Sequence, residues 1–182
     1  GVYVKPVLVT RIEDKNGTVL FENTPETHDV VSAEVARAVV NLMEGVTRYG
    51  SGARLRTKGA ETYNAIYKNV MTGYPYQFTN PIAGKTGTTQ NNSDGWFIGM
   101  VPNLVTGVWV GGEDRAIHFR TTAYGQGATM ALPVFGYYMK KCYADKDLNV
   151  SKGAFPAPQN IEIPIDCNKE KEGGTEEPEI DF

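Results

Sequence analysis

Three short β-rich runs lie in the middle of the chain, separated by turn residues. The runs cover residues 82–88, 96–101 and 104–110, and residues 90–94 and 102–103 supply the turns. Turns this tight join antiparallel neighbours, because a parallel return needs a crossover of a dozen or more residues. The pattern therefore predicts a three-stranded antiparallel sheet.

Two longer segments show apolar residues at helical spacing. The first begins after Ser32, a typical N-cap residue, and we expect one face to be buried. That face carries Val35, Ala38, Val39, Leu42, Met43 and Val46. The second segment has Pro133 near its first turns, where a missing N–H costs least. Its predicted apolar stripe is Ala128, Ala131, Leu132, Phe135, Tyr138, Met139 and Cys142.

The remaining segments complete an α+β fold in which helices cover an antiparallel sheet. The start of the chain predicts a hairpin, with residues 7–12 and 18–21 as strands and the Asn-Gly turn of residues 14–17 between them. Residues 57–80 are interpreted as a surface excursion containing a short helix. We divide the chain at residue 145, and residues 146–182 form an irregular, Pro-rich and acidic tail.

Composition narrows the classes of function. With 182 residues, 41% of them hydrophobic, the chain can build one sizeable core. The net charge is −3, and the part from Asp166 onward holds seven acids and two lysines, so it carries −5. A nearly neutral body with an acidic tail argues against nucleic-acid binding. Two isolated histidines and two cysteines offer no metal-ligand spacing, and we expect no metal and no cofactor.

No run approaches the ~20 apolar residues that span a bilayer, and the start of the chain lacks a signal-peptide pattern. We therefore expect any membrane anchor or export signal to lie outside this chain.

The most informative stretch is Gly84-Lys-Thr-Gly-Thr-Thr89. A phosphate-binding P-loop is excluded, because position 79 is Thr where that loop needs Gly and no helix follows. Two interpretations remain: a Gly/Thr edge strand with an incidental lysine, or the Lys-Thr-Gly element of serine acyl-transferases that act on D-alanyl peptides and β-lactams.

A wider resemblance favours the second interpretation. Residues 82–97, followed by Val108-Trp-Val-Gly-Gly112, closely resemble the bifunctional (class A) penicillin-binding proteins. The stretches 6–21, 46–53 and 127–133 are also similar to that family, so the resemblance covers roughly residues 1 to 145. It implies the C-terminal part of a transpeptidase domain, with a serine β-lactamase-like fold.

The resemblance assigns roles to single residues. Lys85, Thr86, Gly87 and Thr88 would form the catalytic strand that faces the nucleophilic serine. Lys85 supplies positive potential, and Gly87 allows close approach of the ligand. Thr86 and Thr88, with Thr89 beside them, would bind the terminal carboxylate of a stem peptide or penicillin. The backbone N–H of Thr88 would be one oxyanion donor.

Two further residues match the Asp-x-Trp-Phe element of the family. Asp94 and Trp96 are expected to support the site without reacting, and we interpret Trp96 as a core residue.

The family also needs Ser-x-x-Lys for its nucleophile and base, and Ser-x-Asn for proton relay. None of the four serines (Ser32, Ser51, Ser93 and Ser151) begins either pattern. Because covalent catalysis needs nucleophile and base within hydrogen-bond reach, we expect this chain alone to be inactive.

The implied parent is a bifunctional, membrane-anchored peptidoglycan synthase on the periplasmic face of the bacterial inner membrane. It would cross-link D-Ala-D-Ala stem peptides, maintain the cell wall and cell shape, and be an antibiotic target through acylation by β-lactams. Two alternatives stay open: a piece of a serine β-lactamase or D,D-carboxypeptidase, and a non-catalytic cell-wall binding module.

Overall fold

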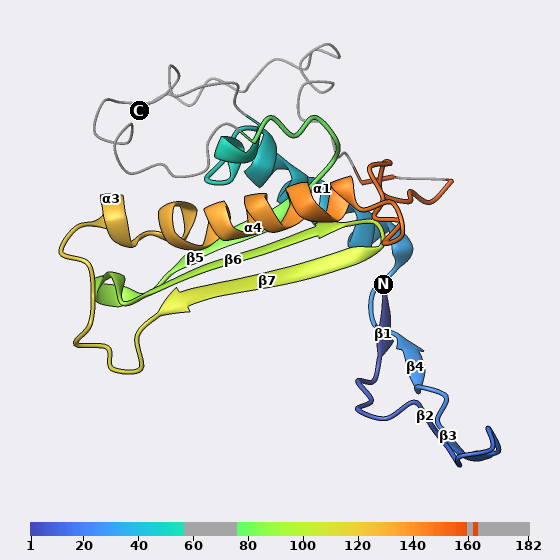
Figure 1. The fold of residues 1–182 in the computed structure, drawn as a ribbon. Coiled ribbons are helices and arrows are strands. Elements are labelled where there is room, and N and C mark those ends of the chain that lie inside the picture. The colour runs from blue at the N-terminus through green and yellow to red at the C-terminus, as the bar shows by residue number, and fades with distance from the viewer. Residues whose placement is uncertain (57–75, 160–161, 164–182) are drawn as a thin grey trace. The chain divides into compact units, whose positions relative to one another are not determined.

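The computed structural model describes residues 1–56, 76–159 and 162–163 (Figure 1). The chain divides into two compact units, one made of residues 1–38 and 157–182, the other of residues 39–156. Among the described residues, no helix is both long and apolar enough to cross a membrane.

The first unit contains two short antiparallel strand pairs. β1 (Val2–Val4) pairs with β4 (Thr27–Asp29), and β2 (Arg11–Glu13) pairs with β3 (Val19–Glu22). The second pair confirms the predicted hairpin, although the regular strand begins only at Arg11. Its turn is closed by Asp14, whose Oδ1 accepts the backbone N–H groups at positions 16 and 18. These backbone hydrogen bonds hold the pKa of Asp14 below its ordinary value.

The second unit is built on the predicted three-stranded antiparallel sheet. β5 (Ala83–Thr88), β6 (Asp94–Val101) and β7 (Leu104–Gly111) are adjacent in that order. Burial alternates along β6, where Gly95, Phe97, Gly99 and Val101 are buried and the residues between them are not. The sheet therefore has one covered and one open face.

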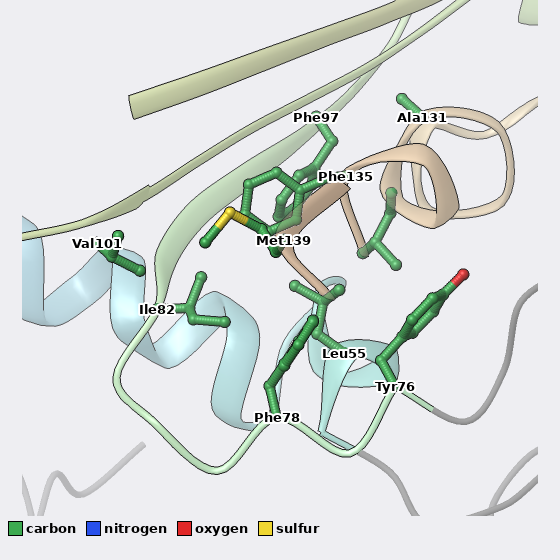
Figure 2. Close-up of a cluster of buried hydrophobic side chains, with 10 residues drawn as sticks. Leu55, Tyr76, Phe78, Ile82, Phe97, Val101, Ala131, Phe135 and Met139 are labelled. Atoms are coloured by element: carbon green, nitrogen blue, oxygen red, sulfur yellow. The ribbon is translucent and has the colours of Figure 1, made fainter. Parts of the chain in front are cut away.

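The helix α4 (Gly127–Ala144) packs along the covered face, preceded by the short α3 (Thr122–Gly125) (Figure 1). The rings of Phe97 and Phe135 meet edge to face with centroids 4.8 Å apart. Figure 2 shows them in the centre of the core, with Met139, Ile82 and Leu55 nearby. A Cβ on Gly99 would lie 2.5 Å from the Phe135 ring, so glycine there lets the ring reach the sheet.

The stripe predicted for this helix is buried except at Tyr138, which is 42% exposed. Pro133 is the seventh residue of α4. It lies near the start of the helix, as expected, but beyond the first turn, where its missing N–H would cost least. Cys142 is buried on the helix, and Cys167 lies outside the described residues.

The predicted first helix is α1 (Ala33–Arg48), and Ser32 Oγ caps it by accepting the N–H of Val35 at 3.2 Å. The expectation that its apolar face is buried was wrong. Val35, Val39 and Leu42 are exposed, Leu42 at 73%, and Ala38, Met43 and Val46 are only half-buried, whereas Glu44 and Thr47 are fully buried. Hydrogen bonding explains the inversion, because the hydroxyl of Thr47 donates to the carbonyl of Ile82 at the entry to β5.

The interpretation of residues 57–80 as a surface excursion was wrong at its end. Tyr76 and Phe78 are core residues, 5% and 8% exposed, and their rings contact those of Tyr137 and Tyr143. Burial raises the pKa of Tyr76 far above its ordinary value. The proposed helix around residue 66 lies outside the described residues.

Candidate functional site

The Lys-Thr-Gly-Thr stretch, residues 85–88, lies on β5, which forms one edge of the described sheet. Its neighbour is β6 alone, with Lys85 opposite Ile98 and Gly87 opposite Trp96. An edge strand leaves every second backbone N–H and C=O without a partner in the sheet, and an extended peptide can bind to these groups.

Side chains alternate along this strand, so the four residues point to both faces of the sheet. Thr86 and Thr88 pair with Phe97 and Gly95, the buried positions of β6, whereas Lys85 pairs with the exposed Ile98. Lys85 is exposed, and its Nζ donates to the carbonyl oxygen of Thr86 at 2.9 Å. The lysine and the two threonine hydroxyls can therefore approach one ligand only around the edge of the sheet.

Both threonine hydroxyls are held by residues that sequence analysis gave no role. Ser51 Oγ lies 2.6 Å from Thr86 Oγ1, and the backbone N–H of Gly127 donates to Thr88 Oγ1 at 3.1 Å. A Cβ on Gly127 would lie 2.2 Å from the carbonyl oxygen of Gly87, so only glycine allows this approach. Ser51 and Gly127 lie in the stretches 46–53 and 127–133, whose similarity to the family marked them as relevant. That similarity does not reveal which residues they contact.

A second group of polar side chains fixes the turn after β5. Asp94 Oδ2 accepts hydrogen bonds from Thr89 Oγ1 at 2.9 Å and Ser93 Oγ at 3.1 Å, and Asp94 Oδ1 accepts from Trp109 Nε1 at 3.2 Å. The bond from Thr89 is the main reason that the pKa of Asp94 is held below its ordinary value. In this arrangement Thr89 points at Asp94, so its hydroxyl is engaged inside the turn.

Trp96 does not occupy the core as expected. Its ring is 42% exposed on the open face of the sheet, with its centroid 6.5 Å from that of Trp109. The reason is register, because Trp96 is one residue from the buried Phe97 and must point the other way.

Two arginines in the segment after α1 bind other parts of the second unit. Arg54 is buried, and its guanidinium donates to the carbonyl of Ala128 at 3.1 Å and to Thr129 Oγ1 at 3.0 Å. Arg56 donates to the carbonyl oxygens of Thr47 and Asn80, both at 2.9 Å. Burial lowers the pKa of Arg56 from its ordinary value. The bonds of Arg54 fix the residues after α1 against the start of α4, and the bonds of Arg56 join them to the end of α1 and to Asn80.

A cavity of about 310 Å³ borders the turn after β5, and Ser93, Gly112, Ile117, Phe119 and Met130 contribute to its lining. Its walls are mostly apolar. In the described part of the chain, no three His, Cys, Asp or Glu side chains come close enough together to hold a metal ion.

Residues 1–129 match the family model described as the penicillin binding protein transpeptidase domain. The chain is 32% identical over 168 residues to penicillin-binding protein 1A of Aquifex aeolicus, which covers 91% of this chain and 19% of that protein. It is 31% identical over 118 residues to penicillin-binding protein 1B of Escherichia coli, covering 65% and 12%.

Among solved structures, penicillin-binding protein 1A from Haemophilus influenzae matches with a TM-score of 0.56 and 20% identity, over 86% of this chain and 25% of that one. This likeness supports the α+β transpeptidase fold. The chain spans less than a fifth of the length of the curated relatives given above. Because the family model covers most of the chain and a relative exceeds 30% identity, the chain belongs to the penicillin-binding protein transpeptidase-domain family.

Proposed function

We propose that this chain is the substrate-binding half of a peptidoglycan D,D-transpeptidase. The enzyme would cross-link stem peptides by serine acyl transfer, and β-lactams would acylate it. The proposal rests on the family, whose model covers residues 1–129, and on the chemistry of the exposed strand β5. The partners are the D-Ala-D-Ala end of a stem peptide and β-lactams.

The reaction gives each residue of the strand a task. Lys85 supplies positive potential beside an anionic peptide end. The hydroxyls of Thr86 and Thr88 donate hydrogen bonds to the terminal carboxylate, and charge-assisted bonds of this kind are roughly twice as strong as neutral ones. The backbone N–H of Thr88 stabilises the oxyanion of the tetrahedral intermediate, and Gly87 leaves room for the ligand backbone.

The neighbouring residues have supporting tasks in this proposal. Asp94 holds the turn after β5 through Thr89, so Thr89 acts at the site mainly through the turn. Trp96 lies on the open face opposite Gly87 and shapes that side of the strand.

The nucleophilic serine, its lysine and the relay residue come from elsewhere in the full-length gene product, so the 182-residue chain alone does not react. We place the enzyme on the periplasmic side of the bacterial inner membrane, anchored by a segment outside this chain. The bifunctional synthase architecture is part of the same proposal.

One observation carries the proposal. The Lys-Thr-Gly-Thr sequence forms an edge strand with Lys85 exposed, and protein groups already hydrogen-bond to the oxygens of Thr86 and Thr88. An incidental edge strand would not need two hydroxyls two residues apart, each held by a different element.

The test is acylation of the full-length gene product by a fluorescent penicillin. Lys85→Ala should lower the second-order acylation rate by at least about 100-fold, since removal of electrostatic stabilisation at an active site typically costs about 10²–10³ in rate. Lys146→Ala, which removes another exposed lysine, should leave the rate unchanged.

Intact-protein mass spectrometry completes the test. The full-length product should gain one stable adduct outside residues 1–182, and the isolated chain should gain none. A stoichiometric adduct on the isolated chain contradicts the proposal. Rapid loss of the adduct by hydrolysis would favour a β-lactamase, and acylation that ignores Lys85→Ala would favour a binding module.

A further inference from the structure

The residues that follow α1 form a compact turn beside β5. The N–H of Gly52 donates to the carbonyl of Val46 at 2.9 Å, and the N–H of Ala53 donates to the carbonyl of Gly50 at 3.0 Å. One turn earlier, the buried Thr47 is bonded to the carbonyl of Ile82. Ser51 therefore stands at a fixed place on the surface, with its backbone neighbours bonded independently of its side chain.

From that place Ser51 reaches the proposed substrate strand. Its Oγ lies 2.6 Å from Thr86 Oγ1, and the two residues are 35 positions apart in the chain. A hydroxyl has one proton and two acceptor lone pairs, so either oxygen can be the donor in this bond. The direction of this bond decides whether Thr86 still has a proton to donate to a ligand.

An ionised carboxylate only accepts hydrogen bonds. If Thr86 donates to Ser51, its single proton is used and it has none for the ligand. If Ser51 donates to Thr86, the proton of Thr86 is free to point at a carboxylate. A bound carboxylate therefore selects the second direction, in which Ser51 donates.

Thr88 shows the same arrangement with no ambiguity. An amide N–H can only donate, so the bond from Gly127 to Thr88 Oγ1 occupies an acceptor lone pair and leaves the threonine proton free. When Ser51 donates, both threonines have a protein donor behind the oxygen, and both can present a proton to the same anion. Donation into a hydroxyl also polarises it and strengthens the next bond in the chain.

We propose that Ser51 is a positioning residue of the carboxylate-binding site: it donates to Thr86 and so orients the Thr86 hydroxyl as a donor to the carboxylate of the peptide or β-lactam. This inference rests on the proposed function and extends it to a residue that need not touch the ligand. It predicts that Ser51 affects recognition of the carboxylate and has little effect on stability, because an exposed hydrogen bond contributes little.

The experiment compares benzylpenicillin with its methyl ester as acylating agents of the full-length gene product. The ester keeps the ring and lacks the carboxylate. Ser51→Ala should lower the acylation efficiency for the acid by about tenfold, the loss typical of a bond to a charged group, and that for the ester by less than about twofold. The loss should appear in the binding constant and not in the limiting acylation rate.

Two further variants make the result specific. Ser51→Thr keeps a hydroxyl and should restore the preference for the acid. Ser51→Ala added to Thr86→Val should change the acid-to-ester ratio no further, because the group that Ser51 orients is already gone. If Ser51→Ala does not fold, as judged by its thermal unfolding midpoint, Ser51→Cys replaces it, since a thiol is a weak donor of similar size.

The outcomes separate this inference from the proposed function. If Thr86→Val lowers the acid-to-ester ratio and Ser51→Ala does not, or if Ser51→Ala slows both compounds equally, the positioning role is overturned and the proposed function stands. If neither Thr86→Val nor Lys85→Ala changes acylation, the proposed function fails and the role of Ser51 fails with it.

Discussion

The side chains around Asp94 show how a single carboxylate fixes the end of β5. Thr89 donates to Asp94 Oδ2 and, in return, its oxygen accepts the backbone N–H of Asp94 at 3.0 Å. Trp109 donates to the other carboxylate oxygen from the neighbouring strand β7. The bonds that the carboxylate accepts from Thr89 and Trp109 favour its ionised form, so the turn, and the strand that it follows, depend on the charge of Asp94.

This dependence gives a pH prediction for Asp94. A carboxyl whose pKa is lowered on folding stabilises the native state above its unfolded value, 3.8, and this contribution is lost as the pH falls through the lowered native value. The free energy of unfolding of the 182-residue chain should therefore fall more steeply below about pH 4 than that of Asp94→Asn. Urea titrations at pH 7, 4 and 3 measure the difference.

Asp147→Asn is the matched control, since it removes an exposed aspartate at the end of the helical region. The role assigned to Asp94 would be contradicted if the free energy of unfolding fell equally steeply with pH in wild type and Asp94→Asn, while Asp147→Asn changed that dependence.

Among the secondary structure elements, the part of α1 that belongs to the second unit buries polar groups. Glu44 and Thr47 are buried, and Arg56 connects the end of the helix to residues 78–80 by donating to Thr47 and Asn80. The guanidinium also donates to Thr47 Oγ1 at 2.9 Å, so one side chain bonds the helix end at two atoms. A planar, multiply bonded guanidinium is not replaced by an ammonium.

Arg56→Lys should therefore destabilise the chain by about 1.5–3 kcal/mol, the range for lost hydrogen bonds to a charged group. The measurement is the urea midpoint at constant slope, so that a change in stability is separated from a change in compactness. Arg120→Lys, at an exposed position, should change the midpoint little. Equal effects of the two substitutions would show that the bonds of Arg56 do not hold α1.

For the chain as a whole, the main feature is an open apolar face on the sheet. Trp96, Ile98, Val105 and Trp109 are between 42% and 67% exposed, and strand pairing puts them on the face that α4 does not cover. Contiguous exposed apolar patches mark interaction surfaces or promote association. The isolated chain should therefore self-associate or bind hydrophobic dyes more than a typical monomer.

Val105→Glu tests this expectation, because the side chain is 67% exposed and lies outside the core, so that replacing it costs little stability. The substitution should lower dye fluorescence and shift the sedimentation distribution toward monomer. Gln90→Glu adds the same charge at an exposed position away from this face and should have a smaller effect. If both substitutions act equally, net charge and not the apolar face governs association.

Local signals in the sequence were sufficient for the hairpin, the two long helices and the three-stranded sheet with the strand of the site, but not for the β1–β4 pair or α3. Tight turns and β-rich runs gave the three strands and their antiparallel pairing, Ser32 marked the start of α1, and the Lys-Thr-Gly-Thr residues were placed on a strand. These features depend on backbone preferences and on hydrogen bonds within a few residues, so neighbouring residues in the sequence are enough to predict them.

Only the tertiary structure decided which surfaces are buried and which distant residues meet. The apolar stripe of α1 is at most half-buried, Trp96 is outside the core, Tyr76 is inside it, and Ser51 contacts Thr86. Apolar periodicity shows that a face prefers to leave water, but burial depends on which other elements come to lie against it. A hydrogen bond between residues 35 positions apart follows from that packing, and no local pattern in the sequence encodes it.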